Sequence, residues 1–236
     1  MVQRPVASEF APTALVFPGG RVDEADADPA WDRLAGVDDA AAEAILAGAA
    51  PPGPPARAFL VAAAREAFEE ARVLLTTGAA LDGEWATGAQ LQVQRGEEAF
   101  ARVLDAAGLR LDLTAVVYIS RWITPEGLPR RYDTAFFAAA MPPGQEPAAA
   151  PGEIEDLMWL TPEDALGRQA AGAVMLPPTT TTLRALAGYD TVAGALEGLR
   201  LSRNLKPILP RLVQAGGNVA PQLVVDMPAA DEETPA

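Results

Sequence analysis

Residues 65–73 read Arg-Glu-Ala-Phe-Glu-Glu-Ala-Arg-Val. Their three glutamates, Glu66, Glu69 and Glu70, stand at positions i, i+3 and i+4. At about 100° per residue they fall within an arc of roughly 100° on one face of a helix. Because apolar residues occupy the opposite face, the sequence predicts a helix over residues 58–75 with one side in a core and one acidic side.

The acidic face requires a positive charge among its carboxylates. Glutamates at this spacing repel one another and destabilise a helix when nothing offsets them. Mg²⁺ and Mn²⁺ prefer oxygen ligands and commonly share their coordination between carboxylates and substrate phosphates. A metal held there can orient a diphosphate and lower the pKa of an attacking water. A Glu-x-x-Glu-Glu pattern alone is more often a solvated helix face, so a second signal is needed.

The second signal is the Pro-Gly-Gly sequence at residues 18–20, which follows the apolar run of residues 14–17. Such a run predicts a strand that ends in a tight loop, where the backbone can approach a ligand closely. Together the loop and the acidic helix resemble the Nudix box, G-x5-E-x7-R-E-U-x-E-E-x-G-U, with U aliphatic. The resemblance implies an α/β Nudix fold, a mixed β-sheet sandwiched between helices, here with extra C-terminal helices.

The resemblance also implies roles for individual box residues. Glu66, Glu69 and Glu70 are expected to hold Mg²⁺ or Mn²⁺ together with the carbonyl of Gly20, and Glu66 and Glu70 are the expected chief ligands. The box arginine, Arg65, is expected to pair with a box glutamate rather than to bind phosphate. One of the glutamates would accept the proton of the attacking water, and which one does so differs between Nudix proteins.

An insertion interrupts the box. Arg65 follows Gly20 by 45 positions, where the pattern has 14, so 31 additional residues lie inside it. Asp26 stands where the pattern has its first glutamate. The insertion, residues 27–57, predicts a short helix over 38–46 and ends in a proline-rich linker. An insertion here resembles the Nudix branch that includes a peroxisomal coenzyme A diphosphatase of mammals.

A second departure is Arg72, which takes the position of the last glycine of the pattern. Glycine suits the positive φ with which many helices end. Arg72 therefore predicts one of two outcomes, a helix prolonged through Leu75 or a strained helix end. In both cases its charge is favourable near a helix C-terminus, and it leaves the carboxylates untouched.

Downstream segments continue the resemblance. Residues 113–124 and 131–141 are rich in aromatic and apolar residues and flank a Pro-Glu-Gly turn, which predicts two paired strands. Residues 153–160 predict a further strand. Helices are expected over 95–107, 162–171, 178–187 and 190–200.

Candidate substrate-binding residues stand at the start of the second paired strand, namely Arg131, Tyr132 and Asp133. They line a substrate pocket in one interpretation and a solvated sheet surface in the other, and the sequence favours neither. Some Nudix enzymes use a late carboxylate as metal ligand or base, a role open to Glu153 or Glu155. The favoured interpretation for both is a solvated loop.

The resemblance predicts one Nudix hydrolase domain over residues 1–210, with 27–57 as its insertion. Residues 211–236 form a C-terminal extension, and its acidic, proline-containing tail is predicted to be disordered from about residue 227. Only 17 residues precede Pro18, fewer than the strand or two that usually open a Nudix domain. An upstream start or a missing edge strand is therefore expected.

Composition limits the chemistry and the partners. The chain has 236 residues, a formal net charge of −14, and neither cysteine nor histidine. Thiolate metal sites, cysteine nucleophiles and Ser-His-Asp triads are therefore excluded. The acidic charge disfavours nucleic acid and anionic membranes as partners. No apolar run approaches the roughly 20 residues of a membrane span, and no peroxisomal S-K-L address ends the chain, so the cytoplasm is the expected compartment.

These observations predict metal-dependent hydrolysis of the diphosphate bond in a nucleoside diphosphate linked to another group. The branch resemblance favours CoA or an acyl-CoA, cut to 3′,5′-ADP and a 4′-phosphopantetheine product, while ADP-ribose, NADH and nucleotide sugars stay open. The alternative is a non-catalytic Nudix-like module that binds a nucleotide or a protein. The intact, mutually repelling glutamates oppose it. A homodimer is a further expectation, since Nudix proteins often dimerise.

Overall fold

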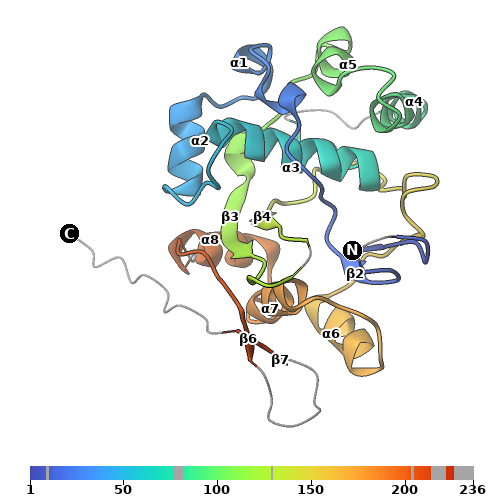
Figure 1. Ribbon diagram of the computed structural model, residues 1–236. Coiled ribbons are helices and arrows are strands. Elements are labelled where there is room, and N and C mark those ends of the chain that lie inside the picture. The colour runs from blue at the N-terminus through green and yellow to red at the C-terminus, as the bar shows by residue number, and fades with distance from the viewer. Residues whose placement is uncertain (9–10, 77–81, 129, 203–204, 214–221, 226–236) are drawn as a thin grey trace.

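The computed structural model describes residues 1–8, 11–76, 82–128, 130–202, 205–213 and 222–225, and Figure 1 shows the arrangement of its elements. Helices pack around small antiparallel sheets, which confirms the predicted α/β class. No helix within these ranges is long and apolar enough to cross a membrane. The predicted disordered tail from about residue 227 lies outside the described residues.

Helical segments occupy much of the first half of the chain. Their bounds are η1 (Glu24–Ala27), α1 (Trp31–Leu34), α2 (Asp39–Leu46), α3 (Ala56–Ala71), α4 (Gly83–Gln94) and α5 (Phe100–Ala106). The helix predicted over 38–46 is confirmed as α2, and the side chain of Asp38 caps it by accepting a hydrogen bond from the Ala41 amide at 2.7 Å. The helix predicted over 95–107 begins only at Phe100.

Helix α4 was not predicted. Its buried positions carry small or polar residues, Ala86, Ala89 and Gln90 among them, so the apolar periodicity that marks an amphipathic helix is weak. The amide of Gln90 donates to the carbonyls of Glu69 at 2.9 Å and Ala148 at 3.2 Å. A contact with α3 rather than a sequence pattern therefore places this helix.

The strands form small sheets. A three-stranded antiparallel sheet has the order β2-β1-β5 and consists of β1 (Val2–Gln3), β2 (Leu15–Val16) and β5 (Asp156–Leu157). The predicted hairpin is confirmed as β3 (Val117–Ile123) paired with β4 (Asp133–Ala138), after the 3₁₀ helix η2 (Leu113–Ala115). The strand predicted over 153–160 is reduced to the two residues of β5.

The remaining elements close the domain. They are α6 (Pro162–Ala170), α7 (Pro177–Leu186), α8 (Val192–Ser202) and the antiparallel pair of β6 (Arg211–Val213) and β7 (Gln222–Val224). The three C-terminal helices agree with their predicted ranges to within two residues. Thr161 caps α6 by accepting a hydrogen bond from the Asp164 amide at 3.1 Å.

The β3–β4 hairpin lies between two groups of helices, with α3 on one side and α7 and α8 on the other (Figure 1). Tyr118 belongs to the main core with α3, whereas Val117 and Ile119 pack against Leu199 of α8. This alternation follows from the two-residue period of a strand. Strand β3 is therefore covered on both faces, as the sandwiched sheet of the expected fold requires.

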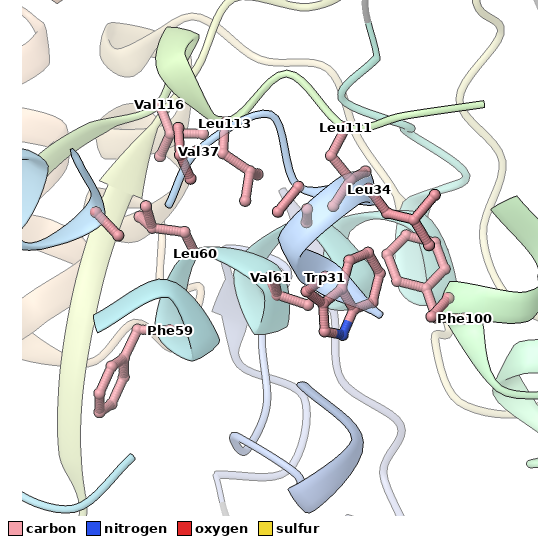
Figure 2. Packing of buried hydrophobic residues seen from close by; sticks show 14 of the residues in the cluster. Trp31, Leu34, Val37, Phe59, Leu60, Val61, Phe100, Leu111, Leu113 and Val116 are labelled. Atoms are coloured by element: carbon pink, nitrogen blue, oxygen red, sulfur yellow. The ribbon is translucent and has the colours of Figure 1, made fainter. Parts of the chain in front are cut away.

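The insertion belongs to the main core rather than to a surface loop. Trp31 is 1% exposed, and its ring lies 5.6 Å from that of Phe100 (Figure 2). Its Nε1 donates to the carbonyl of Ala25 at 2.8 Å, so the indole satisfies its polar atom while its carbon atoms pack. Leu34 and Leu46 are also buried in the same cluster. The extra residues therefore contribute to stability.

Helix α3 ends at Ala71, so the predicted extension to residue 75 is wrong. Arg72 adopts a left-handed conformation with φ 54° and ψ 34°, which is the second of the two predicted outcomes. Its guanidinium donates to the Glu146 carbonyl at 3.0 and 3.2 Å and to the Thr87 hydroxyl at 2.8 Å. These hydrogen bonds offset the cost of about 1–2 kcal/mol that a side chain meets in this conformation.

Candidate functional site

Arg65 lies within the acidic cluster, and only 9% of its side chain is exposed. Its Nε and Nη2 donate to the two carboxylate oxygens of Asp26 at 2.9 and 3.0 Å. Its Nη1 donates to Glu66 at 2.8 Å and to Glu69 at 3.1 Å. Nη2 also donates to the backbone carbonyl of Arg21 at 2.7 Å. The expected pairing of the box arginine with a box glutamate is therefore present.

Asp26 connects the beginning of the insertion to the acidic helix. It is 1% exposed and lies 39 positions before Arg65 in the sequence. Its Oδ2 also accepts a hydrogen bond from the Asp23 amide at 2.8 Å, which fixes the first turn of η1. The aspartate in the place of the first glutamate of the pattern thus anchors Arg65 from the side opposite the helix carboxylates.

The glycine loop packs directly against the carboxylates of α3. The Gly19 amide donates to Oε2 of Glu70 at 3.0 Å. A Cβ atom built on Gly20 would overlap Oε1 of Glu66 and lie 2.6 Å from its carboxyl carbon. Any side chain at Gly20 would therefore displace Glu66. Close approach to the helix explains the glycine at this position.

A cavity of about 440 Å³ lies where the small sheet, the glycine loop and α3 meet. Its lining includes the site residues Gly20, Arg65, Glu66, Glu69 and Glu70. The structure thus brings together every residue of the box that the sequence singled out for catalysis or metal binding. Glu153 lines the same cavity, whereas Glu155 does not.

Burial shifts the protonation of the acidic face. It raises the pKa of Glu69 to about 7, because attraction by Arg65 offsets only part of the effect and Glu66 and Glu153 repel the charge. Burial raises the pKa of Glu70 to about 8, where a backbone hydrogen bond opposes the shift and the same two glutamates add to it. Burial also raises the pKa of Glu66 in spite of Arg65. A group of carboxylates with raised pKa values favours an added positive charge.

A divalent cation fits the chemistry of these donors. Among the described residues, no three side chains of Asp, Glu, His or Cys form by themselves a group that could hold a metal ion. The glutamates are engaged by Arg65 and by the Gly19 amide. Mg²⁺ commonly takes only one or two carboxylates, since substrate phosphates and waters complete its octahedral shell. The backbone of Gly20 against the Glu66 carboxylate fits such a shared site.

The three candidate substrate-binding residues do not share one environment. Arg131 and Tyr132 line a second cavity of about 410 Å³, together with Arg21 and Arg130. Asp133 lines neither cavity. Both of its carboxylate oxygens accept hydrogen bonds at 2.6 Å from Arg121 on β3.

Sequence reasoning missed two arginines, Arg4 and Arg21, which both line the first cavity. Nε of Arg4 is buried and has no hydrogen-bond partner among the described residues, and the charge of Arg4 lowers the pKa of Glu70 slightly against the effect of burial. Arg21 directly follows Gly20, and this adjacency to the box was the one available signal. Nothing in the sequence marks Arg4, because its position depends on the pairing of β1.

The comparisons with known proteins agree with this geometry. The model of the NUDT19 Nudix domain matches residues 1–184. The acyl-coenzyme A diphosphatase NUDT19 of Gallus gallus is 30% identical in an alignment that covers 75% of this chain and 57% of that protein. The acyl-coenzyme A diphosphatase NUDT19 of Homo sapiens is 29% identical in an alignment that covers 84% of this chain and 65% of that protein. The chain thus spans less than two thirds of these curated relatives.

A solved structure supports the fold. The crystal structure of a NUDIX hydrolase from Alicyclobacillus acidocaldarius superposes with a TM-score of 0.65 at 29% identity. The superposition covers 83% of this chain and 86% of the chain of that hydrolase. The predicted Nudix fold is therefore confirmed, and the match over residues 1–184 shows that the chain belongs to the NUDT19 Nudix domain family.

Proposed function

We propose that the protein hydrolyses the diphosphate bond of a nucleoside diphosphate derivative, with CoA or an acyl-CoA as the favoured substrate and Mg²⁺ or Mn²⁺ as the cofactor. One observation carries the proposal: the glutamates of α3, the glycine loop and Arg65 line a single cavity. The substrate preference is supported by the similarity of the chain to proteins named acyl-coenzyme A diphosphatase.

The chief metal ligands would be Glu66 and Glu70, which share the ion with Glu69, the carbonyl of Gly20 and the oxygens of the substrate. When bound, the ion would offset negative charge on the diphosphate and lower the pKa of the attacking water. ADP-ribose, NADH and nucleotide sugars share the same diphosphate group and belong to the same proposal as less favoured substrates.

Arg65 positions the carboxylates rather than the substrate. One of its nitrogens donates to both Glu66 and Glu69, and its other edge is held by Asp26. The fork geometry of a guanidinium allows both edges to be used at once. A lysine cannot do this. The acidic face is therefore held in one orientation before substrate arrives, which lowers the reorganisation needed for reaction.

Protons and anionic oxygens are handled by other residues of the cavity. The general base would be one of the helix glutamates or Glu153, all of which line the cavity. Arg4 lines the cavity and supplies a cation beside Glu70. This cation favours an anionic substrate, which the net charge of −14 otherwise repels.

The test is product analysis with Mg²⁺ or Mn²⁺ on CoA, acetyl-CoA, ADP-ribose, NADH and UDP-glucose. The key variant is Glu70→Gln, whose amide oxygen can still accept the hydrogen bond from Gly19 while the charge is lost. We expect turnover to fall by on the order of a hundredfold. Glu43→Gln, an exposed change on α2, removes the same charge away from the cavity and is the matched control.

Retention of full turnover by Glu70→Gln would contradict the proposed role of Glu70. If the folded wild-type protein turned over none of these substrates yet bound a nucleotide without metal, the non-catalytic binding module would replace the proposal.

A further inference from the structure

The second cavity differs in charge from the first and lies next to it. It is lined by Arg21, Arg130, Arg131 and Tyr132, and none of these residues is acidic. Arg21 lines both cavities, so the loop that follows the glycines separates an acidic cavity from a basic one. In a chain with a net charge of −14, a group of three arginines is a local exception.

Backbone hydrogen bonds at the mouth of the β3–β4 hairpin orient Arg131. Its Nε donates to the Thr124 carbonyl at 3.0 Å, and the amide of Tyr132 donates to the Thr124 hydroxyl at 2.9 Å. The Thr124 amide donates in return to the Tyr132 carbonyl at 2.8 Å. Within the described part of the chain, the terminal nitrogens of Arg131 make no hydrogen bond. A cation held from one edge with its other edge free is arranged to receive an anion.

Arg21 is fixed from the opposite side. Its carbonyl accepts a hydrogen bond from Arg65 at 2.7 Å, which ties its backbone to the acidic cluster. Arg21 is an exposed residue, and its side chain makes no ion pair within the described part of the chain. A ligand that contacts Arg21 in the basic cavity is therefore adjacent to a diphosphate in the acidic one.

We infer that the basic cavity binds a phosphomonoester on the ribose of the substrate, a 2′- or 3′-phosphate, while the diphosphate lies against the helix glutamates. The inference rests on the proposed function and deepens it. The two cavities share the lining residue Arg21, so a ligand that occupies both carries a second anion close to its diphosphate. Arginine forks match phosphate oxygens in pairs, which makes a phosphomonoester the fitting anion.

The experiment measures binding rather than turnover, so that it does not depend on catalysis. Adenosine 3′,5′-bisphosphate, adenosine 2′,5′-bisphosphate and AMP are titrated calorimetrically into wild-type protein with Mg²⁺. We expect one bisphosphate to bind roughly tenfold more tightly than AMP, the gain typical of a charge-assisted contact. The preferred isomer identifies which ribose position carries the phosphate.

Arg131→Gln should reduce the ratio of bisphosphate to AMP affinity towards one. Arg102→Gln removes the same charge from an exposed position on α5 and should leave the ratio as in the wild type. The second readout is hydrolysis of CoA against 3′-dephospho-CoA. If the 3′-phosphate is recognised, wild-type KM is lower for CoA, and Arg131→Gln removes that difference.

Equal binding of AMP and both bisphosphates would overturn the inference, even if CoA were hydrolysed. An unchanged affinity ratio in Arg131→Gln would overturn it too. A clear preference without hydrolysis would support the basic cavity and count against the proposed function alone.

Discussion

At the scale of single residues, the site is organised around one buried cation. Arg65 contacts carboxylates from both halves of the interrupted box, Asp26 before the insertion and Glu66 after it. A buried charge that loses its partner is costly, because neither water nor another residue replaces the lost hydrogen bonds. The geometry of the acidic face therefore depends on Asp26, which holds Arg65 but lies outside helix α3.

Asp26→Asn tests this dependence. The amide retains the size of the side chain but removes the charge that faces Arg65, and one of its two positions becomes a donor. We expect the free energy of unfolding to fall by about 2 kcal/mol, measured by chemical denaturation. Glu24→Gln, exposed on the same η1 segment, is the control and should change stability by less than about 0.5 kcal/mol. Equal stability of the two variants would contradict the anchoring role.

The raised pKa values of Glu69 and Glu70, about 7 and about 8, predict how stability depends on pH. The folded protein without metal holds protons that the unfolded chain releases near its ordinary pKa of 4.5. Protonation then favours folding at low pH, and stability is lost as pH rises through 7 and 8. In EDTA, we expect Tm to be lower at about pH 8 than at about pH 5.5.

Two companion measurements separate this effect from general acid or base damage. Glu70→Gln should weaken the dependence of Tm on pH, because one of the titrating groups is gone. Added Mg²⁺ should raise Tm most at the higher pH, where the carboxylates are ionised. A Tm that rises with pH in EDTA would show that the carboxylates are not protonated in the folded state.

At the scale of elements, the end of α3 shows how a helix can stop without glycine. Arg72 takes the left-handed conformation and its side chain ties the helix end to α4 through Thr87. The helix therefore ends at Ala71, and Glu66, Glu69 and Glu70 lie within its last turns.

A pair of substitutions at Arg72 separates backbone strain from side-chain hydrogen bonds. Arg72→Ala loses the hydrogen bonds and keeps the strain, so we expect a loss of about 1–2 kcal/mol in the free energy of unfolding. Arg72→Gly loses the same bonds but relieves the strain, and it should be more stable than the alanine variant by about 1 kcal/mol. Denaturant titration of both proteins measures the difference. An alanine variant as stable as the glycine variant would mean that this position carries no strain.

At the scale of the whole molecule, the insertion links the core to the site. Trp31 packs on Phe100, which in turn stacks on Phe68 of α3 with ring centroids 5.8 Å apart. The same indole bonds to Ala25 in η1, the segment that carries Asp26. Removing the insertion would therefore both open the core and release the anchor of Arg65.

Trp31→Ala should lower the free energy of unfolding by about 3–5 kcal/mol, the range for loss of a large buried aromatic side chain. The matched control is Trp159→Ala, since Trp159 is 74% exposed and its removal should cost less than about 0.5 kcal/mol. Denaturation followed by circular dichroism avoids the change in fluorescence that both substitutions cause. A small effect at Trp31 would place the insertion outside the cooperative core.

Features of this protein that depend on short spacings could be predicted before the fold was known. The acidic face of α3 and the Pro-Gly-Gly loop could be predicted because both are set by helix periodicity or by local turn chemistry. The paired strands β3 and β4 followed from their composition and the turn between them. Glu66, Glu69 and Glu70 could be predicted to share one face for the same reason, since their spacing alone places them there.

Features that depend on contacts between distant segments could be recognised only in the folded chain. It pairs Asp26 with Arg65 across 39 positions, buries Trp31 of the insertion in the core, and sets the basic cavity beside the acidic one through Arg21. Neither periodicity nor propensity encodes such contacts, because they arise only when packing brings separate faces together and their hydrogen bonds must be satisfied.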